Sequence, residues 1–195
     1  MISYQYKFIF VHAGRTGGSS FERIAGTPIT DDARTEGLGN TDFDEKHKGF
    51  EYYKQHYPAE FTAFFKFTIV RNPYDRLVSA WKWQTAVVKN QKLSTLKDFI
   101  EARPDASKYS EKFKLEGLSV FESIKKFDYI GRFEDLISTY YHLSKKLNIQ
   151  MDAIPHTNRT GLGEYQKYYD EDTIDLVRKK YSIDLELFGY GYNYL

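Results

Sequence analysis

Residues 8–20 read FIFVHAGRTGGSS, a short apolar run followed directly by a glycine-rich turn. Residues 7–11, apolar at every position after Lys7, have the pattern of a buried parallel strand. Helical signals begin after Gly18, where Ser19 and Ser20 can cap the first turn of a helix. A strand, a glycine-rich turn and a helix in this order predict the opening of an α/β unit.

The turn at 12–20 has the composition of an anion-binding loop. Such a turn directs several backbone N–H groups and the positive end of the following helix at one point, where phosphate or sulfate binds. A nucleoside triphosphate loop needs Gly, four residues and then Gly-Lys-Ser/Thr. Here Gly18 precedes Ser19 in place of that lysine, and the basic residue of the turn is Arg15. The turn alone leaves two interpretations open, an anion site and a tight connection in which the glycines serve only the backbone.

Two further apolar runs predict strands beside the first. FFKFTIV, residues 64–70, leads into RNPYDRLVSAWKW at 71–83, where Asn72 is a natural N-cap and Pro73 suits the first helical position. FDYIGRF, residues 127–133, is the third predicted strand. Strands that alternate with helices predict a three-layer α/β sandwich with a central parallel sheet covered on both faces.

The chain is expected to form one domain, 1–195, because 195 residues can fill one core well. Residues 26–49 are rich in Asp, Thr and Gly without periodicity and predict a long loop. The middle section, 93–126, has the pattern of a lid or an insertion. We expect variable, substrate-side segments at about 27–49 and 93–126.

Composition excludes several classes of function. The 28 basic and 27 acidic side chains leave a net charge of +1, which argues against bulk electrostatic binding to nucleic acid or to an anionic membrane. There are no cysteines, so disulfides, thiolate zinc sites and a cysteine nucleophile are excluded. The sequence shows no signal peptide and no run of about 20 apolar residues, and we expect a cytoplasmic protein. Acidic residues such as Asp75 lack metal-ligand spacing, so no metal is expected.

Arg71 marks a second candidate anion site. It stands at the carboxyl end of a predicted buried strand, where ligands of open α/β sheets bind. On the following helix Asn72, Arg76 and Ser79 share one face, and a guanidinium with a hydroxyl suits a phosphate. An ion-pair role is the alternative for Arg71, but the strand-end position favours the phosphate. Arg76 is expected to be a solvated helix residue.

Two anion sites at two strand ends suggest a ligand with phosphates at both ends, and here the chain resembles a known family. FIFVHAGRTGGSSFE and FKFTIVRNPYDRLVSAW are similar to the 5′-phosphosulfate loop and the 3′-phosphate motif of sulfotransferases that use PAPS, 3′-phosphoadenosine 5′-phosphosulfate. YIGRFEDL and the tail YYDEDTIDLVRKKYSIDLELFGY are also similar, so the resemblance covers most of the chain. It is strongest to the branch that contains carbohydrate sulfotransferases and their bacterial relatives.

The resemblance implies a P-loop-like site that binds PAPS and releases PAP. The 5′-phosphosulfate would be held through backbone N–H and hydroxyl groups of five loop residues, Thr16, Gly17, Gly18, Ser19 and Ser20. Arg71 and Ser79 would hold the 3′-phosphate. HTNRTG resembles the segment that closes over the nucleotide, and it implies Arg159 and Thr160 as further contacts. Phe133 could line the adenine, although a core phenylalanine is the favoured interpretation.

Arg15 departs from the pattern, since relatives usually carry lysine there, placed against the oxygen that bridges phosphate and sulfate. Arginine keeps the positive charge that stabilises this oxygen as the bond breaks. It cannot donate its proton near neutral pH, because its pKa exceeds about 12. Arg15 is therefore expected to bind the donor and to serve catalysis through its charge.

Sulfuryl transfer to a hydroxyl group needs a base, and histidine titrates near neutrality. His47 follows the long loop, where this branch carries a catalytic histidine, and we expect it to deprotonate the acceptor. The alternative is a solvated loop histidine between Lys46 and Lys48. The other histidines have other expected roles: shaping of the turn for His12, exposure for His56, packing or surface exposure for His142, and the nucleotide-side loop for His156.

The sequence thus predicts a PAPS-dependent sulfotransferase that acts on a hydroxyl-bearing acceptor, a glycan or a small molecule, by in-line attack on sulfur. Three alternatives stay open. An ATP-dependent phosphotransferase is disfavoured by the absent Gly-Lys-Ser/Thr and by the lack of a magnesium carboxylate. A PAP- or PAPS-binding protein without catalysis is kept open by Arg15. A structural or adaptor protein would need neither phosphate motif.

Overall fold

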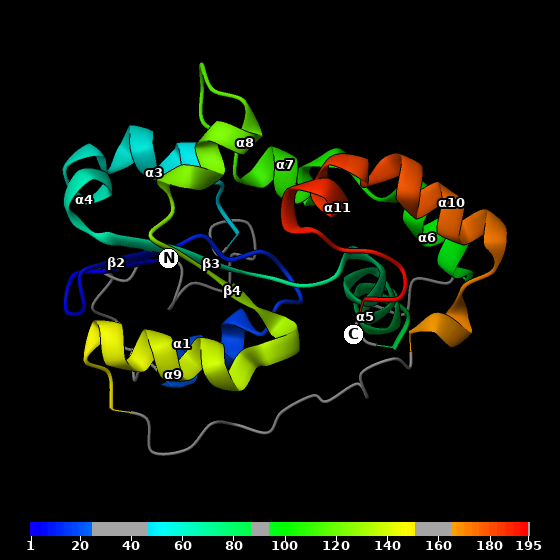
Figure 1. The fold of residues 1–195 in the computed structure, drawn as a ribbon, viewed down its shortest axis with the longest axis horizontal. Coiled ribbons are helices and arrows are strands. Elements are labelled where there is room, and N and C mark those ends of the chain that lie inside the picture. Colours follow the sequence, from blue (N-terminus) through cyan, green and yellow to red (C-terminus); the bar gives the residue numbers. More distant parts are fainter. Residues whose placement is uncertain (25–46, 87–93, 151–164, 195) are drawn as a thin grey trace.

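The computed structural model describes residues 1–24, 47–86, 94–150 and 165–194, and a sheet of four strands lies at its centre (Figure 1). In sheet order the strands are β1 (Ile2–Ser3), β2 (Phe8–Phe10), β3 (Phe65–Val70) and β4 (Tyr129–Arg132). Strands β2, β3 and β4 are parallel, and each lies inside its predicted run. Their carboxyl ends therefore meet at one edge of the sheet.

The first strand runs antiparallel to β2, so the sheet is mixed. Only residues 4–7 separate β1 from β2. A connection this short returns the chain antiparallel, whereas a parallel crossover needs a dozen or more residues. Lys7 takes a left-handed conformation, with φ 52°, at the end of the turn. The expectation of a wholly parallel sheet is therefore wrong at this edge.

Helices cover both faces of the sheet, which gives the three layers expected from the sequence (Figure 1). On one face lie α1 (Gly18–Ile24) and α9 (Leu136–Leu147). The opposite side carries α3 (Phe50–His56), α4 (Pro58–Ala63), α7 (Tyr109–Lys112), α8 (Val120–Ser123) and α11 (Ser182–Phe188). Short 3-10 turns stand at Asp105–Ser107, Ile124–Lys126, Phe133–Asp135 and Gln166–Tyr168.

Alternation along β2 divides the core in two. Phe8 and Phe10 pack with the helices of one face, and Ile9 and Val11 pack with those of the other. All four side chains are fully buried. This explains why the strand is apolar at every position, as a strand covered on both faces must be.

A third cluster joins α5 (Pro73–Ala86), α6 (Leu96–Ala102) and α10 (Glu171–Lys180) beside the sheet. Helix α5 begins at the predicted position. Oδ1 of Asn72 accepts from the N–H of Tyr74 at 3.1 Å, which confirms the predicted cap and fixes the direction in which α5 leaves β3.

The described part of the middle section, 94–126, belongs to the core. Phe99, Tyr109 and Phe113 are at most 1% exposed. These apolar side chains are buried against the rest of the domain, and the prediction of a lid or an insertion stays a prediction. That the sequence of section 93–126 varies between relatives stays a prediction. Most of the predicted loop at 26–49 lies outside the described residues.

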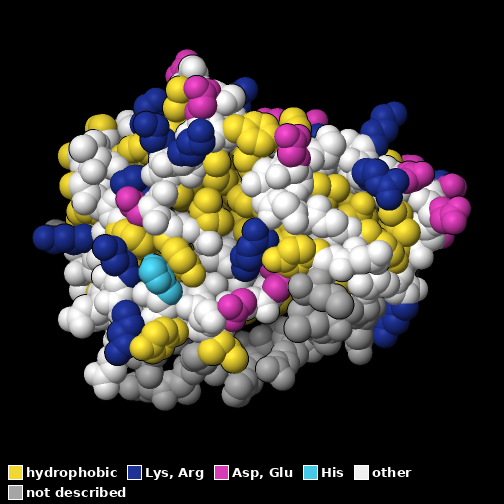
Figure 2. Space-filling model, in the orientation of Figure 1, with side chains coloured by type: hydrophobic (Ala, Val, Ile, Leu, Met, Phe, Trp, Pro, Cys, Tyr) yellow, Lys and Arg dark blue, Asp and Glu magenta, His cyan; other side chains and the backbone are white. Residues whose placement is uncertain are grey.

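Within the described ranges, no helix is long and apolar enough to cross a membrane. Basic and acidic side chains both occur across the face drawn in Figure 2, in keeping with the net charge of +1. Any anion site must therefore come from a few placed groups.

Candidate active site

The turn after β2 is closed by its own hydrogen bonds. The Thr16 hydroxyl donates to the Ala13 carbonyl at 2.6 Å, and the N–H of Ser20 donates to the Gly17 carbonyl at 2.9 Å. Arg15 and Gly17 have positive φ angles of 68° and 83°. A left-handed arginine is strained, and such residues gather at functional sites. The buried hydroxyl of Thr16 already donates inside the turn. Of the groups of Thr16 predicted to bind an anion, this leaves the backbone N–H.

Neighbouring side chains fix the turn from outside. The His12 ring packs against Gly18, where a methyl group would lie 2.3 Å from Nε2 of His12. The Tyr140 hydroxyl on α9 donates to the Gly17 carbonyl at 2.9 Å. His12 therefore shapes the turn, as the sequence predicted. Ser19 is exposed in the first turn of α1.

Arg15 links the two predicted anion sites. Its Nε and Nη2 both donate to Oγ of Ser79 on α5 at 3.2 Å. Its carbonyl accepts from Nη1 of Arg71 at 3.1 Å. The sequence placed Arg15 in one site and Arg71 with Ser79 in another, and the structure brings all three together where β2 and β3 end.

The guanidinium of Arg71 is held from several sides, and the residue is 3% exposed. Its Nε donates to Oδ2 of Asp75 at 2.8 Å in an ion pair. The ring centroid of Phe133 lies 3.9 Å from the guanidinium carbon. Phe133 is thus half-buried against Arg71, and its favoured interpretation as a core residue is wrong. Arg15 is an exposed residue, but partial burial of its guanidinium, and then the charge of Arg71, lower its pKa from the ordinary 12.5.

The backbone beside Arg71 is fixed by residues that sequence reasoning missed. The hydroxyl of Tyr109 on α7 accepts from the Arg71 N–H at 2.8 Å and donates to the Arg71 carbonyl at 2.9 Å. Oε1 of Glu134 accepts from the Asn72 N–H at 2.6 Å, and Oε2 accepts from the Tyr190 hydroxyl at 2.8 Å. Glu134 could have been found from the sequence, because it directly follows the third predicted strand. Tyr109 had none, because nothing local relates it to Arg71.

His47 lies against the turn, half-buried. Its Nδ1 is 3.2 Å from the carbonyl oxygen of His12, and a methyl group on Gly14 would lie 3.8 Å from its Cε1. Since a carbonyl only accepts, Nδ1 carries the hydrogen in this contact, and Nε2 is the acceptor nitrogen of the neutral ring.

Lys112, at the end of α7, holds the backbone of His47. Its Nζ donates to the His47 carbonyl. Burial, and then the charge of Arg76, lower the pKa of Lys112 to about 8. A further cationic group therefore lies beside the histidine.

Arg76 does not join Ser79 at the anion site. It is 5% exposed, its Nη1 donates to the Ser107 carbonyl at 2.8 Å, and its guanidinium carbon lies 4.2 Å from the Tyr109 ring centroid. The expectation of a solvated Arg76 is wrong, because residues 105–112 pack against this side of α5 and cover it.

Several other predicted residues can be placed briefly. His56 is exposed in the last turn of α3, as expected. His142 is exposed on α9, and its ring stacks on Tyr129 at 4.1 Å. Three predicted residues lie outside the described residues: His156, Arg159 and Thr160.

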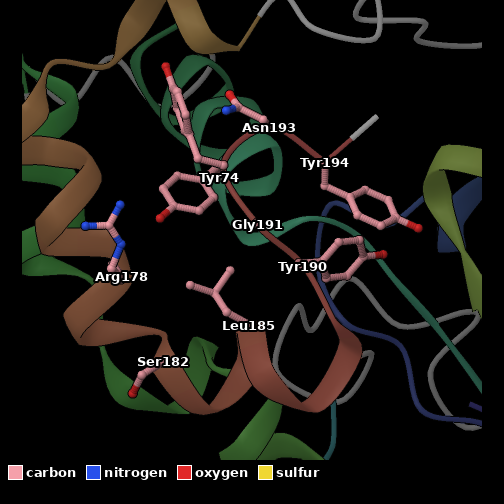
Figure 3. Close-up of a pocket in the computed structure, with 9 residues that line it drawn as sticks. Tyr74, Arg178, Ser182, Leu185, Tyr190, Gly191, Asn193 and Tyr194 are labelled. Carbon is pink, nitrogen blue, oxygen red and sulfur yellow. The ribbon is translucent and has the colours of Figure 1, made fainter.

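A pocket of about 720 Å³ opens between α10, α11 and the C-terminal stretch 190–194 (Figure 3). Its walls include Tyr74, Arg178 and Tyr190, and none of the three residues Arg15, Arg71 and His47 lines it. We therefore place the candidate active site at the strand ends. In the part of the chain that the structure describes, no three His, Asp or Glu side chains gather as metal ligands would.

Comparison with known proteins identifies the family to which the chain belongs. A family model described as the sulfotransferase family matches residues 1–191. The chain belongs to the sulfotransferase family. The fold of this sulfotransferase is similar to that of mouse sulfotransferase SULT7A1, whose crystal structure is complexed with PAP. The TM-score is 0.57 at 12% identity, over 98% of this chain and 91% of that one. No curated protein matches the sequence.

The predicted sulfotransferase family is confirmed, as is a mixed α/β fold around a central sheet. In this sulfotransferase, residues from the turn after β2, the end of β3 and the approach to α3 meet at one edge of the sheet. Three predicted site residues from these segments are Arg15, Arg71 and His47.

Proposed function

We propose that this sulfotransferase transfers the sulfuryl group of PAPS to a hydroxyl group of an acceptor and releases PAP. The observation that carries the proposal is the meeting of Arg15, Arg71 and Ser79 where β2 and β3 end. Family membership, and a fold shared with a sulfotransferase crystallised with PAP, support it.

The groups at this edge fit an anionic nucleotide. Arg15 and Arg71 repel each other, and the lowered pKa of Arg15 reflects burial and that repulsion. A bound phosphate would offset both. We assign the 3′-phosphate to Arg71 and Ser79, with Arg159 and Thr160 as further contacts. The 5′-phosphosulfate is assigned to the turn, through Arg15, Thr16, Gly17, Gly18, Ser19 and Ser20.

PAPS supplies a sulfuryl group attached to a phosphate leaving group. In the proposed reaction, Nε2 of His47 takes the proton of the acceptor hydroxyl as its oxygen attacks sulfur in line. The guanidinium of Arg15 offsets the negative charge that grows on the oxygen from which sulfur departs. The carbonyl of His12 keeps His47 in the required tautomer.

We assign the acceptor to the carbohydrates, with small alcohols as the alternative, because the sequence motifs are most similar to the carbohydrate branch. A second candidate function is PAP or PAPS binding without transfer. It is favoured by the identity of residue 15: the resemblance assigns Arg15 to the leaving-group position, and an arginine cannot donate a proton there.

A transfer assay with labelled PAPS over a panel of glycans and small alcohols tests the proposal. We expect transfer by the wild type, and His47→Ala should lower kcat by at least about 100-fold because the base is lost. The control is His56→Ala, at an exposed histidine of α3, which should keep full turnover. Calorimetry should show that His47→Ala still binds PAP.

The outcomes separate the candidates. Tight PAP binding with no transfer to any acceptor would support the binding function. Tighter binding of ATP than of PAP would contradict both. Unchanged turnover in His47→Ala would remove His47 from the reaction.

A further inference from the structure

Tyr109 closes two hydrogen bonds on the backbone of Arg71. Its hydroxyl accepts from the Arg71 N–H at 2.8 Å and donates to the Arg71 carbonyl at 2.9 Å. The ladder between β3 and β4 ends at the pair Val70 and Arg132, so Arg71 is the first residue beyond it. The Tyr109 hydroxyl therefore fixes the main chain at the point where the strand stops.

We propose that Tyr109 is a positioning residue for Arg71 and thereby gives the site its preference for nucleotides that carry a 3′-phosphate. The proposal rests on the proposed function, in which Arg71 binds that phosphate. The guanidinium itself contacts Asp75, the carbonyl of Arg15 and the ring of Phe133. Tyr109 acts instead on the main chain, whose dihedral angles at Arg71 decide where the guanidinium points.

Tyr109 is itself rigid enough for this role. It is fully buried, and the Asp184 carboxylate accepts from its N–H at 2.8 Å and from the Ser110 N–H at 2.9 Å. The guanidinium of Arg76 lies over its ring. Burial is the main cause that raises the pKa of Tyr109 to about 12, so its hydroxyl stays protonated at neutral pH and can donate.

The selectivity follows from the geometry of arginine. A guanidinium binds phosphate through a planar fork of donors, which works only in the right orientation. A guanidinium on a loosened main chain must be ordered when the ligand binds, and that ordering weakens binding. A nucleotide without a 3′-phosphate does not use Arg71, so a loosened Arg71 should not weaken its binding.

The test compares PAP with AMP, which lacks the 3′-phosphate, by calorimetry on the full chain. Tyr109→Phe keeps the ring and removes both hydrogen bonds. We expect PAP to bind about tenfold more weakly, since a loosened Arg71 must then be ordered when the 3′-phosphate binds. AMP binding should change by less than about twofold. The control is Tyr169→Phe, which removes a half-buried hydrogen bond from a tyrosine hydroxyl to the Tyr74 carbonyl, 2.8 Å long, elsewhere on α5.

An equal loss for PAP and AMP in Tyr109→Phe would overturn the proposal in favour of a general structural role. Unchanged binding of both nucleotides by Tyr109→Phe would also overturn it. A wild type that does not prefer PAP would instead overturn the proposed function. If Tyr109→Phe does not fold, Asp184→Asn loosens Tyr109 at its other end, and it should lower the PAP preference by a smaller factor.

Discussion

Arg15 holds a backbone conformation that arginine rarely adopts, with φ 68°. Strain of this kind costs on the order of 1 kcal/mol and persists only where the surroundings fix the residue. Two donors of its guanidinium bond Ser79, and its carbonyl accepts from Arg71. The strain is therefore retained at the point where the two predicted phosphate motifs touch.

Two substitutions of Arg15 test whether the leaving oxygen needs only a positive charge or also a donated proton. Arg15→Met should lower kcat by about 100-fold or more, because no cation then faces the leaving oxygen. Arg15→Lys keeps the charge, and we expect a kcat within about tenfold of the wild type, since only its fork of donors is lost. Steady-state rates with saturating PAPS measure both. A large gain in Arg15→Lys would show instead that the leaving oxygen needs a proton.

Among the elements, the turn after β2 depends on two neighbours rather than on its glycines alone. His12 fills the space beside Gly18, and Tyr140 of α9 holds the Gly17 carbonyl. Gly17 has φ 83°, where a side chain is strained. The glycine pattern in the sequence therefore has two separate causes, backbone conformation at Gly17 and a close ring at Gly18.

Gly18→Ala tests the packing cause. Its methyl group would lie 2.3 Å from Nε2 of His12, so the ring or the turn must move. We expect the free energy of unfolding to fall by about 1–3 kcal/mol, as measured by denaturant titration. The control is Gly191→Ala, where the added methyl group meets open space. Combining Gly18→Ala with His12→Ala should recover part of the loss, and no recovery would contradict the contact.

Elements were predictable where their signal is local. The three parallel strands lie in short, mostly apolar runs, and β2 is apolar at every position because both of its faces are covered. The cap of α5 was found because Asn72 and Pro73 act on their own helix. Strand β1 was missed, since two residues give no periodicity.

For the whole molecule, the free energy of unfolding should depend on pH through one half-buried lysine, Lys112 of α7. Lys112 has a folded-state pKa of about 8 against an ordinary 10.5, mainly because of burial. Between these values the unfolded chain binds more protons, so the contribution of Lys112 to stability rises with pH.

Lys112→Met should remove this slope. Relative to the variant, the wild type should gain on the order of 3 kcal/mol of unfolding free energy between pH 7 and pH 11. Denaturant titration at both pH values measures the difference. The matched control is Lys114→Met, at an exposed position two residues on. A flat difference for Lys112→Met would contradict the lowered pKa.

The site was only partly predictable from the sequence, since its assembly is long-range. Arg71 was found because a strand end is a local feature. The burial of Arg76 was not foreseen, because α7 covers it from more than 30 residues away. Tyr109 was missed for the same reason. The motifs identified the groups, and only the packed molecule shows which of them meet.

The hydrogen bond from Asn72 Nδ2 to the Gly191 carbonyl, 2.9 Å long, spans 119 residues of chain. It fixes the start of α5, next to Arg71, to the segment around Gly191, which follows α11. Contacts of such high contact order form late, because a long loop must close before they add stability. A chain still being synthesised therefore lacks this contact beside Arg71 until the segment around Gly191 has emerged and docked.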